Sequence, residues 1–511
     1  MKYRPWQIIL LLISYFLTPH LLLGQVKKTA TPTKTKIINI KHAGRLVYDK
    51  SLGIDAKRLI GDVVCEHEGA ILRCDSAYLY DQKKMEAFGH ISIVQDSVSI
   101  FGDKLKYDAN TKLANMDGNV RCIDKDMVLT TNTMIYDVGN SVASYYNGGT
   151  IVNKENTLTS KNGHYYSASK ELTFHYDVVL TNPDYKMNSD TGRYNTVNKT
   201  AYFIGPSIIK SKENYIYCEN GWYDTDKEIS RFSKNTTIVT KEQKLYGDSV
   251  YYDRKIGYAR ATKNIILIDT THKSIMTGNH AEYWEKLNKS IITDKAIYGK
   301  IIDKDTLFLT GDTLLYNAPD SLHSFVKAHP HVKFFKKDLQ GVCDSLVYTT
   351  HDSLMVMYNS PMMWAGNGQV TAKQIRVTVS EHGVKYFELL QNALVIQKSD
   401  SLDENKFNQI TGKKIEGFFA NDSIRKLNVI SNAQIIYYVK QKKNYKGVNK
   451  TICTDLTVWF NADGVDRATF RNKPESTIYP LKEIDDKEMR FKNFMWLENK
   501  RPRKKEDILF K

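Results

Sequence analysis

The sequence predicts an all-β protein built from stacked repeats of about 29 residues. Three observations carry this prediction. A short motif recurs along most of the chain, and apolar and polar residues alternate with a period of two inside each copy. The composition is also rich in tyrosine, with 32 copies, and poor in proline, with 11. Alternation and composition are typical of β-strands, and regular recurrence is typical of folds whose units stack on one another.

The repeat places a polar or acidic residue, an apolar residue and a tyrosine at fixed spacing. Clear copies cover residues 102–108, 131–137, 189–195, 218–224, 247–253, 278–283, 311–317 and 343–348, with looser copies at 44–49, 74–78 and 162–166. The repeat tyrosines lie 29 residues apart, or a multiple of 29, up to Tyr252 and about 32 apart after it. A second landmark, such as Gly118-Asn119-Val120, follows most tyrosines at a similar distance. Two landmarks in step over so many copies exclude chance.

Within one copy the pattern is that of strands joined by turns. Ile91-Ser92-Ile93 and Val98-Ser99-Ile100 alternate, so each predicted strand presents one apolar face inward. Residues 108–111 and 253–257 contain the Asp, Asn and Gly of turns. No stretch of the repeat region shows a convincing apolar stripe of helical period. Each unit is therefore predicted to contain at least two strands, and neighbouring units must stack to bury their shared face.

The chain divides into five predicted regions. Residues 1–24 resemble a signal peptide, because Lys2 and Arg4 precede an apolar run. The alternative, an uncleaved membrane anchor, is disfavoured because this run is shorter than the roughly twenty apolar residues of a spanning helix. Residues 25–36 form a linker, 37–378 the clear repeats, and 379–480 a second, looser β region. The charged residues 481–511 form a C-terminal tail, which is either a solvated end or a docking segment.

The formal net charge of +16 indicates anionic partners. Phosphates, acidic glycans and anionic lipids remain open on this ground. Nucleic acid is not expected as the partner of an exported protein. Charge alone does not choose among the others, and a basic surface that only confers solubility is an equal alternative.

The unit Asp-x-Leu-x-Tyr-Asp, followed by Ala-x-x-x-Gly-Asn-Val, resembles the repeat of the OstA-like family, named for an organic solvent tolerance protein. The resemblance covers residues 37–378 and, more weakly, 405–470. It implies an elongated β-jellyroll, a slightly twisted pair of sheets open along one edge. It also implies a periplasmic role in carrying lipopolysaccharide, or another anionic amphipathic lipid, to the outer membrane with acyl chains between the sheets. Other β-jellyroll transport proteins, joined by edge-strand addition, and outer-membrane assembly components are the expected partners.

A groove for acyl chains needs apolar side chains at the same rung of every unit. The repeat tyrosine and the residue two positions before it share one face of their strand. The candidate groove-lining residues are Leu105, Tyr107, Met134, Tyr136, Tyr194, Tyr223, Val250, Tyr252, Leu314, Tyr316, Leu346 and Tyr348. Burial of an acyl chain contributes about 0.8 kcal/mol per methylene. The alternative is that these rows close on each other as a packed core.

The sequence offers little for catalysis. It contains no metal-binding, phosphate-loop or nucleophile motif, so the protein is predicted to be no enzyme and to hold no metal or cofactor. The repeated aspartates recur once per unit, as turn or strand-start residues do. Two other functions remain open: a structural or adhesive β-solenoid that presents protein-interaction surfaces, and a polysaccharide-active β-helix.

The six cysteines mostly occupy repeat positions, which is typical of small buried residues. Cys74, Cys218 and Cys343 precede the acidic residue of their copies. One candidate disulfide joins Cys65 and Cys74 across a turn at Glu68-Gly69, because an exported protein meets oxidising conditions.

Overall fold

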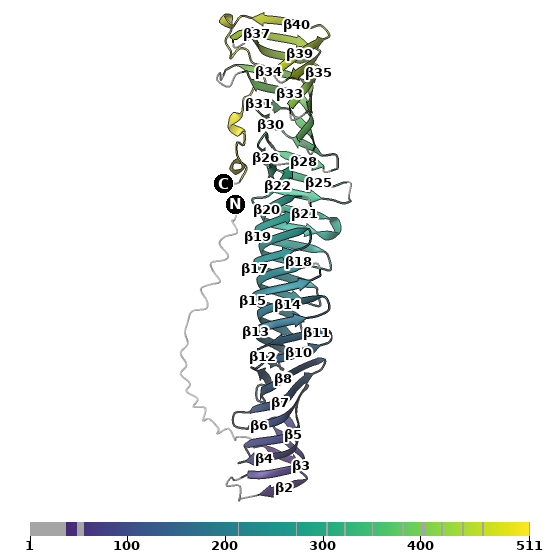
Figure 1. Ribbon diagram of the computed structural model, residues 1–511, viewed down its shortest axis with the longest axis vertical. Coiled ribbons are helices and arrows are strands. Elements are labelled where there is room, and N and C mark those ends of the chain that lie inside the picture. Colours follow the sequence, from purple (N-terminus) through teal and green to yellow (C-terminus); the bar gives the residue numbers. More distant parts are fainter. Residues whose placement is uncertain are drawn as a thin grey trace, which may run out of the picture.

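The computed structural model describes residues 37–509 apart from short gaps at 49–55, 213, 272, 303–304, 321–322, 350, 381–382, 400–404, 421–422, 442–443 and 462–463. The predicted signal peptide and linker, residues 1–36, lie outside the described residues. The described chain forms forty strands in one continuous antiparallel ladder, with only short 3-10 turns besides. The result is a long column (Figure 1), as the repeat predicted.

The first half of the column consists mainly of strands of ten to twelve residues. Its strands are β1 (Asn39–His42), β2 (Arg45–Tyr48), β3 (Ala56–His67), β4 (Ala70–Tyr80), β5 (Lys84–Gln95), β6 (Val98–Asp108), β7 (Leu113–Asp124), β8 (Met127–Asp137), β9 (Val142–Tyr145), β10 (Gly149–Asn153), β11 (Asn156–Ser160), β12 (Asn162–Tyr166), β13 (Glu171–Thr181), β14 (Tyr185–Asn195), β15 (Thr200–Ser211), β16 (Tyr215–Asp224), β17 (Ile229–Val239), β18 (Gln243–Asp253), β19 (Tyr258–Asp269) and β20 (Ser274–Trp284).

The second half begins with shorter strands. Its elements are η2 (Glu285–Leu287), β21 (Lys289–Thr293), β22 (Ile297–Ile302), β23 (Asp305–Thr310), β24 (Thr313–Asn317), β25 (Phe325–His329), β26 (Val332–Lys336), β27 (Leu339–Cys343), β28 (Ser345–Thr349), β29 (Leu354–Tyr358), β30 (Met362–Ala365), β31 (Gly368–Thr371), β32 (Gln374–Ser380), β33 (Gly383–Lys398), β34 (Phe407–Ala420), β35 (Ser423–Ile430), β36 (Ala433–Gln441), β37 (Asn444–Cys453), β38 (Asp455–Asn461), β39 (Gly464–Arg471), β40 (Glu475–Tyr479), η3 (Leu481–Glu483), η4 (Glu498–Lys500) and η5 (Lys505–Asp507). The ladder runs on through β32 and β33, so hydrogen bonding is continuous across the predicted boundary at residue 378.

Many of the long strands are bent in the middle by left-handed residues. Gly118 and Asn119 have φ of 80° and 46°, and Lys263 and Asn264 have 61° and 51°. The pairing register shifts at each such bend. Each bent strand therefore gives one half to each of two sheets, which meet along a crease. Among β21–β32 the bend becomes a break, and separate short strands form the two sheets.

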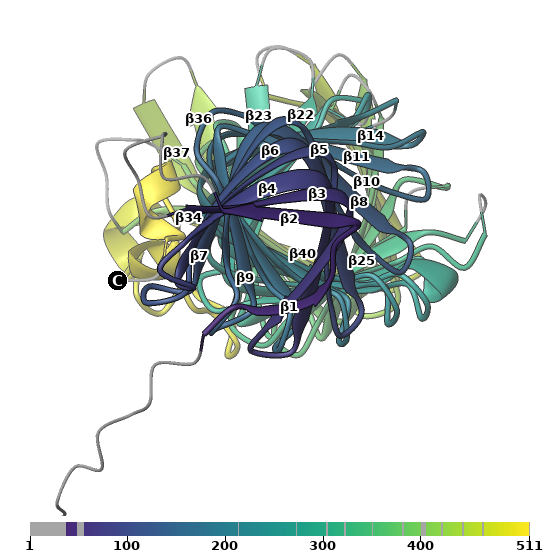
Figure 2. The same cartoon turned by 90° about the horizontal axis from the view of Figure 1, so that it is seen from below.

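We call the two sheets sheet 1 and sheet 2. Sheet 1 contains residues 98–101 of β6, which pair with β7. It continues through β22, β23, β26, β27, β30 and β31. Sheet 2 contains residues 104–108 of β6, which also pair with β7. It continues through β21, β24, β25, β28, β29 and β32. Opposite the crease, the hairpin ends of both sheets form an open edge, here called the mouth. A view along the column shows the rungs superposed (Figure 2).

The crease explains the repeated acidic residue. Asp103 accepts a hydrogen bond from the side chain of Asn119 at 2.8 Å, and Asp248 accepts one from Asn264 at 3.1 Å. The same bond recurs in other units between an acid of one strand and an amide or imidazole of the next; the pairs are Glu219–Asn235, Asp344–Asn359, Asp75–His90 and Asp312–His331. These carboxylates therefore belong to the fold, at the crease. The second aspartate of the repeat lies at a hairpin turn, where Asp108 and Asp224 accept hydrogen bonds from turn N–H groups.

The C-terminal tail is docked. We call residues 481–509 the C-terminal strap; it turns back along the outer face of sheet 1 (yellow in Figure 1). Gln409 and Gln369, both 1% exposed, bind its backbone: the first to Phe491 N–H and Met489 C=O, the second to Leu497 N–H and Met495 C=O. The strap also covers an apolar cluster on that face formed by Leu394, Ile396, Phe407, Ile436, Tyr438 and Val448. The segment thus packs against the sheet of its own chain.

The candidate disulfide is absent. Both Cys65 and Cys74 are free, as are the four other cysteines. In the β3–β4 hairpin Cys65 pairs with Leu72 and Cys74 with Val63, so the two cysteines are not opposite each other. All six thiols are buried, as expected for small core residues.

Candidate functional site

The twelve candidate residues lie on sheet 2. The aliphatic members and methionine, Leu105, Met134, Val250, Leu314 and Leu346, are all buried. Most of the tyrosines pack at the border of the interior: Tyr107, Tyr194, Tyr223, Tyr316 and Tyr348 are partly buried against the core clusters. The sequence prediction that both positions share one face is therefore confirmed for these residues. Whether they line a groove depends on how the facing sheet meets them.

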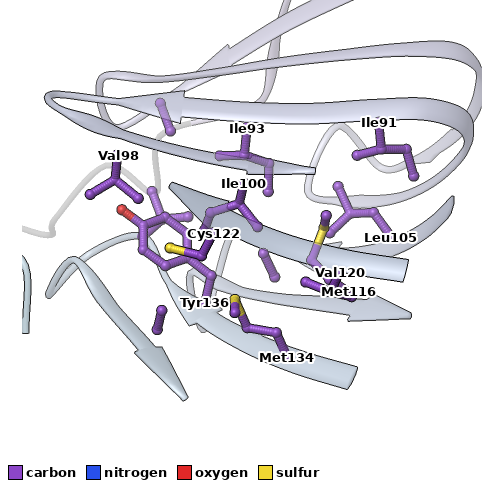
Figure 3. Close-up of a cluster of buried hydrophobic side chains, with 14 of the residues drawn as sticks. Ile91, Ile93, Val98, Ile100, Leu105, Met116, Val120, Cys122, Met134 and Tyr136 are labelled. Carbon is purple, nitrogen blue, oxygen red and sulfur yellow. The ribbon is translucent and has the colours of Figure 1, made fainter. Parts of the chain in front are cut away.

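In the first third of the column the two sheets close on each other. Figure 3 shows Ile93, Ile100 and Cys122 of sheet 1 packed near Met134 and Tyr136 of sheet 2. These side chains belong to a single large buried cluster that extends from Ile38 to Val178. Here the packed-core alternative describes the interior.

Hydrogen bonds across the mouth hold this first third shut. The Tyr136 hydroxyl donates to Gln95 Oε1 at 2.6 Å, and Tyr107 bonds to the ring of His67. One unit on, the Tyr165 hydroxyl donates to Asp124. Lys170 reaches the same carboxylate at 2.7 Å. In each case a repeat tyrosine of sheet 2 reaches the free end of sheet 1.

The hydrogen bonds and burial at the closed mouth shift the pKa values of the side chains involved. Burial raises the pKa of Tyr136 to about 12, and burial followed by nearby carboxylates raises the pKa of Tyr107. Burial opposes ionisation of Asp124, but the bonds from Lys170 and Tyr165 together lower its pKa. The tyrosines thus remain neutral donors and Asp124 an ionised acceptor over the ordinary pH range.

Beyond this sealed third, the interior opens into a first cavity of about 200 Å³. Tyr194 and Tyr223 lie on its sheet 2 side, with Phe174, Leu180 and Met187 among its other lining residues. The buried cluster thins here to Met187, Phe203, Cys218 and Phe232. The lining is mostly apolar, with tyrosines towards the mouth.

A second cavity of about 570 Å³ lies further along the column. Leu346 and Tyr348 line it from sheet 2, and Tyr298, Leu309 and Phe334 line it from sheet 1. A volume of several hundred cubic ångströms is typical of ligand sites. Burial of Tyr298 raises the pKa of its hydroxyl, so this polar tip stays neutral.

The mouth of the second cavity is rich in lysine. Among the described residues, Lys273, Lys300 and Lys336 contribute to its lining, together with one carboxylate, Asp338. Lys336 donates to Asp338 at 2.6 Å. The rim therefore carries an excess of positive charge beside an apolar interior, a combination that suits an amphipathic anion.

The structure divides the candidate residues into separate groups. Leu346 and Tyr348 meet at the second cavity and Tyr194 and Tyr223 at the first, while Leu105 and Tyr107 border only a void of about 30 Å³. Met134 and Tyr136 are core residues, Val250 lies in a small cluster, and Leu314 and Tyr316 pack with the core of the second half. The Tyr252 hydroxyl donates to Glu285 at the border of its own sheet.

Sequence reasoning missed the residues that sheet 1 contributes. Tyr298 follows Ile297 in β22 and Phe334 precedes Phe335 in β26, so alternation gave no clear signal for their direction, and neither residue carries the repeat tyrosine motif. The rim lysines gave no signal among the 73 basic residues. In the described part of the chain no group of His, Cys, Asp and Glu side chains is arranged to hold a metal ion. No helix in that part is long and apolar enough to cross a membrane.

Comparisons with known proteins give a partial match. No curated protein matches the chain. Among solved structures, one similar chain is LptH from Pseudomonas aeruginosa, described as the LptA homologous periplasmic component of the conserved lipopolysaccharide transport device. It is 20% identical, with a TM-score of 0.21, over 23% of this chain and 82% of its own. The model of the OstA-like protein family matches residues 34–190, and in that part of the chain the predicted resemblance to OstA-like proteins is confirmed.

Proposed function

We propose that this protein is a non-enzymatic periplasmic component of outer-membrane biogenesis that binds lipopolysaccharide, or a similar anionic amphipathic lipid, between its two sheets. The observation that carries the proposal is the second cavity, in which an apolar interior opens at a mouth lined by Lys273, Lys300 and Lys336. Acyl chains would contribute about 0.8 kcal/mol per buried methylene. The lysines would bind phosphates of the head group. The OstA-like sequence of residues 34–190 supports the same class of cargo.

The ends of the column support assembly with other β-jellyroll proteins. Among the described strands, β1 and β2 pair only with β3, while β39 pairs only with β38 and β40 only with β37. Most side chains of β39 and β40 are exposed. Strand addition at such edges would join this chain head to tail with transport partners.

Photo-cross-linking tests the cavity directly. A photoreactive phenylalanine analogue at Tyr348 is expected to cross-link to lipopolysaccharide added to the purified full chain. The matched control places the analogue at Tyr358, which is exposed on the outer face of β29, the next strand of sheet 2. Equal cross-linking at the two positions, or none at Tyr348, would refute binding between the sheets and would favour the structural β-solenoid.

The first cavity offers a graded test. A Cβ at Gly192 would meet Phe174 and Val178 at ordinary contact distances of 3.6 and 3.7 Å, and Gly192 needs no left-handed backbone. Gly192→Leu should therefore fold and fill much of the cavity, whereas Gly192→Ala should fill little. If lipid occupies this space, cross-linking from Tyr194 falls in the leucine variant and persists in the alanine variant. Unchanged cross-linking in both variants would remove the first cavity from the proposal.

A further inference from the structure

The outer face of sheet 2 carries a row of arginines and aromatic residues, of which only the first two, Arg193 and Tyr202, also border a cavity. Each member pairs directly with the next across adjacent strands of β14–β19. The arginine–aromatic row consists of Arg193, Tyr202, Trp222, Arg231, Tyr251 and Arg260. With strands about 4.8 Å apart, six strands give a row of roughly 24 Å.

The planar groups of this row lie against one another. The Arg193 guanidinium lies 4.3 Å from the centre of the Tyr202 ring, and that of Arg260 lies 5.9 Å from Tyr251. Aromatic contacts continue from Tyr251 to Tyr258 at 6.4 Å and to Trp284 at 5.7 Å. The outer face thus presents a partly exposed aromatic surface, with rings tilted by 51–60° to one another and cations set among them.

Cross-strand stabilisation alone would also produce aromatic and cationic pairs. The remainder of the same row supplies an internal comparison. Before this stretch Lys106 forms an ion pair with Glu86, and after it Arg376 forms one with Glu388. Other cations of the row have no such partner: Arg58 lies 5.7 Å from the centre of the Tyr78 ring, and Lys327 forms no ion pair with a described residue. The stretch β14–β19 therefore differs in the density of its cations, with three arginines on six strands.

The stretch from β14 to β19 lacks that neutralisation. Among the described residues, none of Arg193, Arg231 and Arg260 forms an ion pair, and Arg231 donates to the Ser249 hydroxyl at 3.0 Å. Glu282 lies opposite Arg260 at the end of the row but bonds to His280. Three guanidinium groups therefore share one face on which the described cross-strand neighbours include a single carboxylate, Glu282 at the end of the row, and an external anion would complement the remaining charge.

The neighbouring row, on the crease side, is mostly neutral and polar. It contains hydroxyl and amide side chains in register with the arginine–aromatic row: Thr191, Asn220, Ser233, Ser249 and Thr262, interrupted only by Ile204. Such groups exchange hydrogen bonds with sugar hydroxyls. Aromatic faces stack on the apolar faces of sugar rings, and arginine binds carboxylate or phosphate in a bidentate manner.

We propose that the arginine–aromatic row is a binding platform for a linear acidic polysaccharide, which lies across strands β14–β19 on the outside of sheet 2. Aromatic side chains would carry the sugar rings, the three arginines would bind the acidic substituents, and the neutral row would bind hydroxyl groups. Arg193 and Tyr202, at one end of the row, also border the first cavity, whereas Trp222, Arg231, Tyr251 and Arg260 line neither cavity.

The test uses the full chain and polygalacturonic acid, a linear chain with one carboxylate per sugar, in affinity electrophoresis. Trp222→Ala and Arg231→Gln should each weaken retention at least tenfold. Arg231 is exposed, so its variant should fold even if the tryptophan variant does not. Tyr358→Ala and Arg121→Ala change an exposed tyrosine and an exposed arginine outside the row and should bind as the parent does.

Four results would overturn the proposal. The first is parental binding by Arg231→Gln together with parental binding by a folded Trp222→Ala. The second is an equal loss in Arg121→Ala, which would indicate general attraction of a polyanion to a basic chain. The third is tighter binding of single-stranded oligothymidine through the same residues, which would assign the row to nucleic acid. Neutral dextran should not be retained, and its retention at parental strength would remove the role of the arginines.

Discussion

Replacing Gln369 by leucine should loosen the C-terminal strap at its middle. The Gln369 side chain is 1% exposed and makes three hydrogen bonds. It donates to Met495 C=O at 2.6 Å and accepts from Leu497 N–H at 2.8 Å and from Trp364 Nε1 at 3.2 Å. Leucine retains a similar volume and makes none of these bonds.

The expected change in the free energy of local opening follows from the polar groups that lose Gln369 as their hydrogen-bond partner. Met495 is 56% exposed, so its carbonyl can turn to water at little cost. Trp364 is fully buried and Leu497 half-buried, and a buried polar group left without a partner costs about 1–3 kcal/mol. Lifting the strap relieves part of this cost, so the free energy of local opening should fall by about 2 kcal/mol. That corresponds to roughly thirtyfold more opening.

Hydrogen exchange at the Leu497 amide measures this opening. The amide should exchange roughly thirty times faster in Gln369→Leu than in the parent, provided that both exchange through local opening. Gln397→Leu is the control, because Gln397 is an exposed glutamine on β33 that donates to Asn367 and does not bind the strap. Unchanged exchange at Leu497, or an equal change in the control, would refute the role assigned to Gln369.

Three further predictions concern the closed third, the thiols and the strap. Tyr136→Phe removes the bond to Gln95 and should lower the free energy of unfolding by about 1 kcal/mol in urea; an unchanged urea midpoint would contradict the closure of the mouth. Burial raises the pKa of Cys65 to about 11 and that of Cys122 to about 12, from an ordinary value of 9.0. Because the folded state favours the neutral thiols, their contribution to the free energy of unfolding is complete below pH 9 and is lost as the pH rises towards 11–12. Urea midpoints at pH 8 and 10.5 should show this decrease, and a higher midpoint at pH 10.5 would contradict it. Deletion of residues 481–511 should uncover the apolar cluster on sheet 1 and increase binding of a hydrophobic dye, whereas an unchanged dye signal would show that the strap does not cover it.

The fold was accessible from the sequence because its signals are local and repeated. The alternation around Leu105 and Tyr107 predicted the inward face, and the spacing of the tyrosines predicted stacking. The landmark Gly118-Asn119 was visible, but its role as the crease was not, because Lys263-Asn264 forms the same left-handed bend without glycine. Left-handed conformation has no unique residue signature, so the bend emerges only in three dimensions.

The site was less accessible because it depends on contacts between distant residues. Tyr136 and Tyr348 occupy the same repeat position, yet one hydroxyl closes the mouth on Gln95 and the other residue lines a cavity. The partner that decides this outcome lies 41 residues away for Tyr136. The docking of the strap likewise depends on Gln369 and Gln409, which are buried glutamines whose backbone partners follow about 80 to 130 residues later.

Side-chain volume at one rung accounts for the place where the first cavity begins. Two positions before the repeat tyrosine, the first third carries Leu105 and Met134, which fill the space between the sheets. The next unit has Gly163, but the ring of Tyr145 occupies the space of its missing side chain, within 2.5 Å of where a Cβ would stand. At Gly192 the nearest atoms lie 3.6 Å or more away, and the first cavity begins there. A glycine at this rung thus opens the interior only where no neighbouring side chain occupies the space of its missing Cβ. The first cavity therefore depends on Gly192 together with the side chains around it, and not on the repeat position alone.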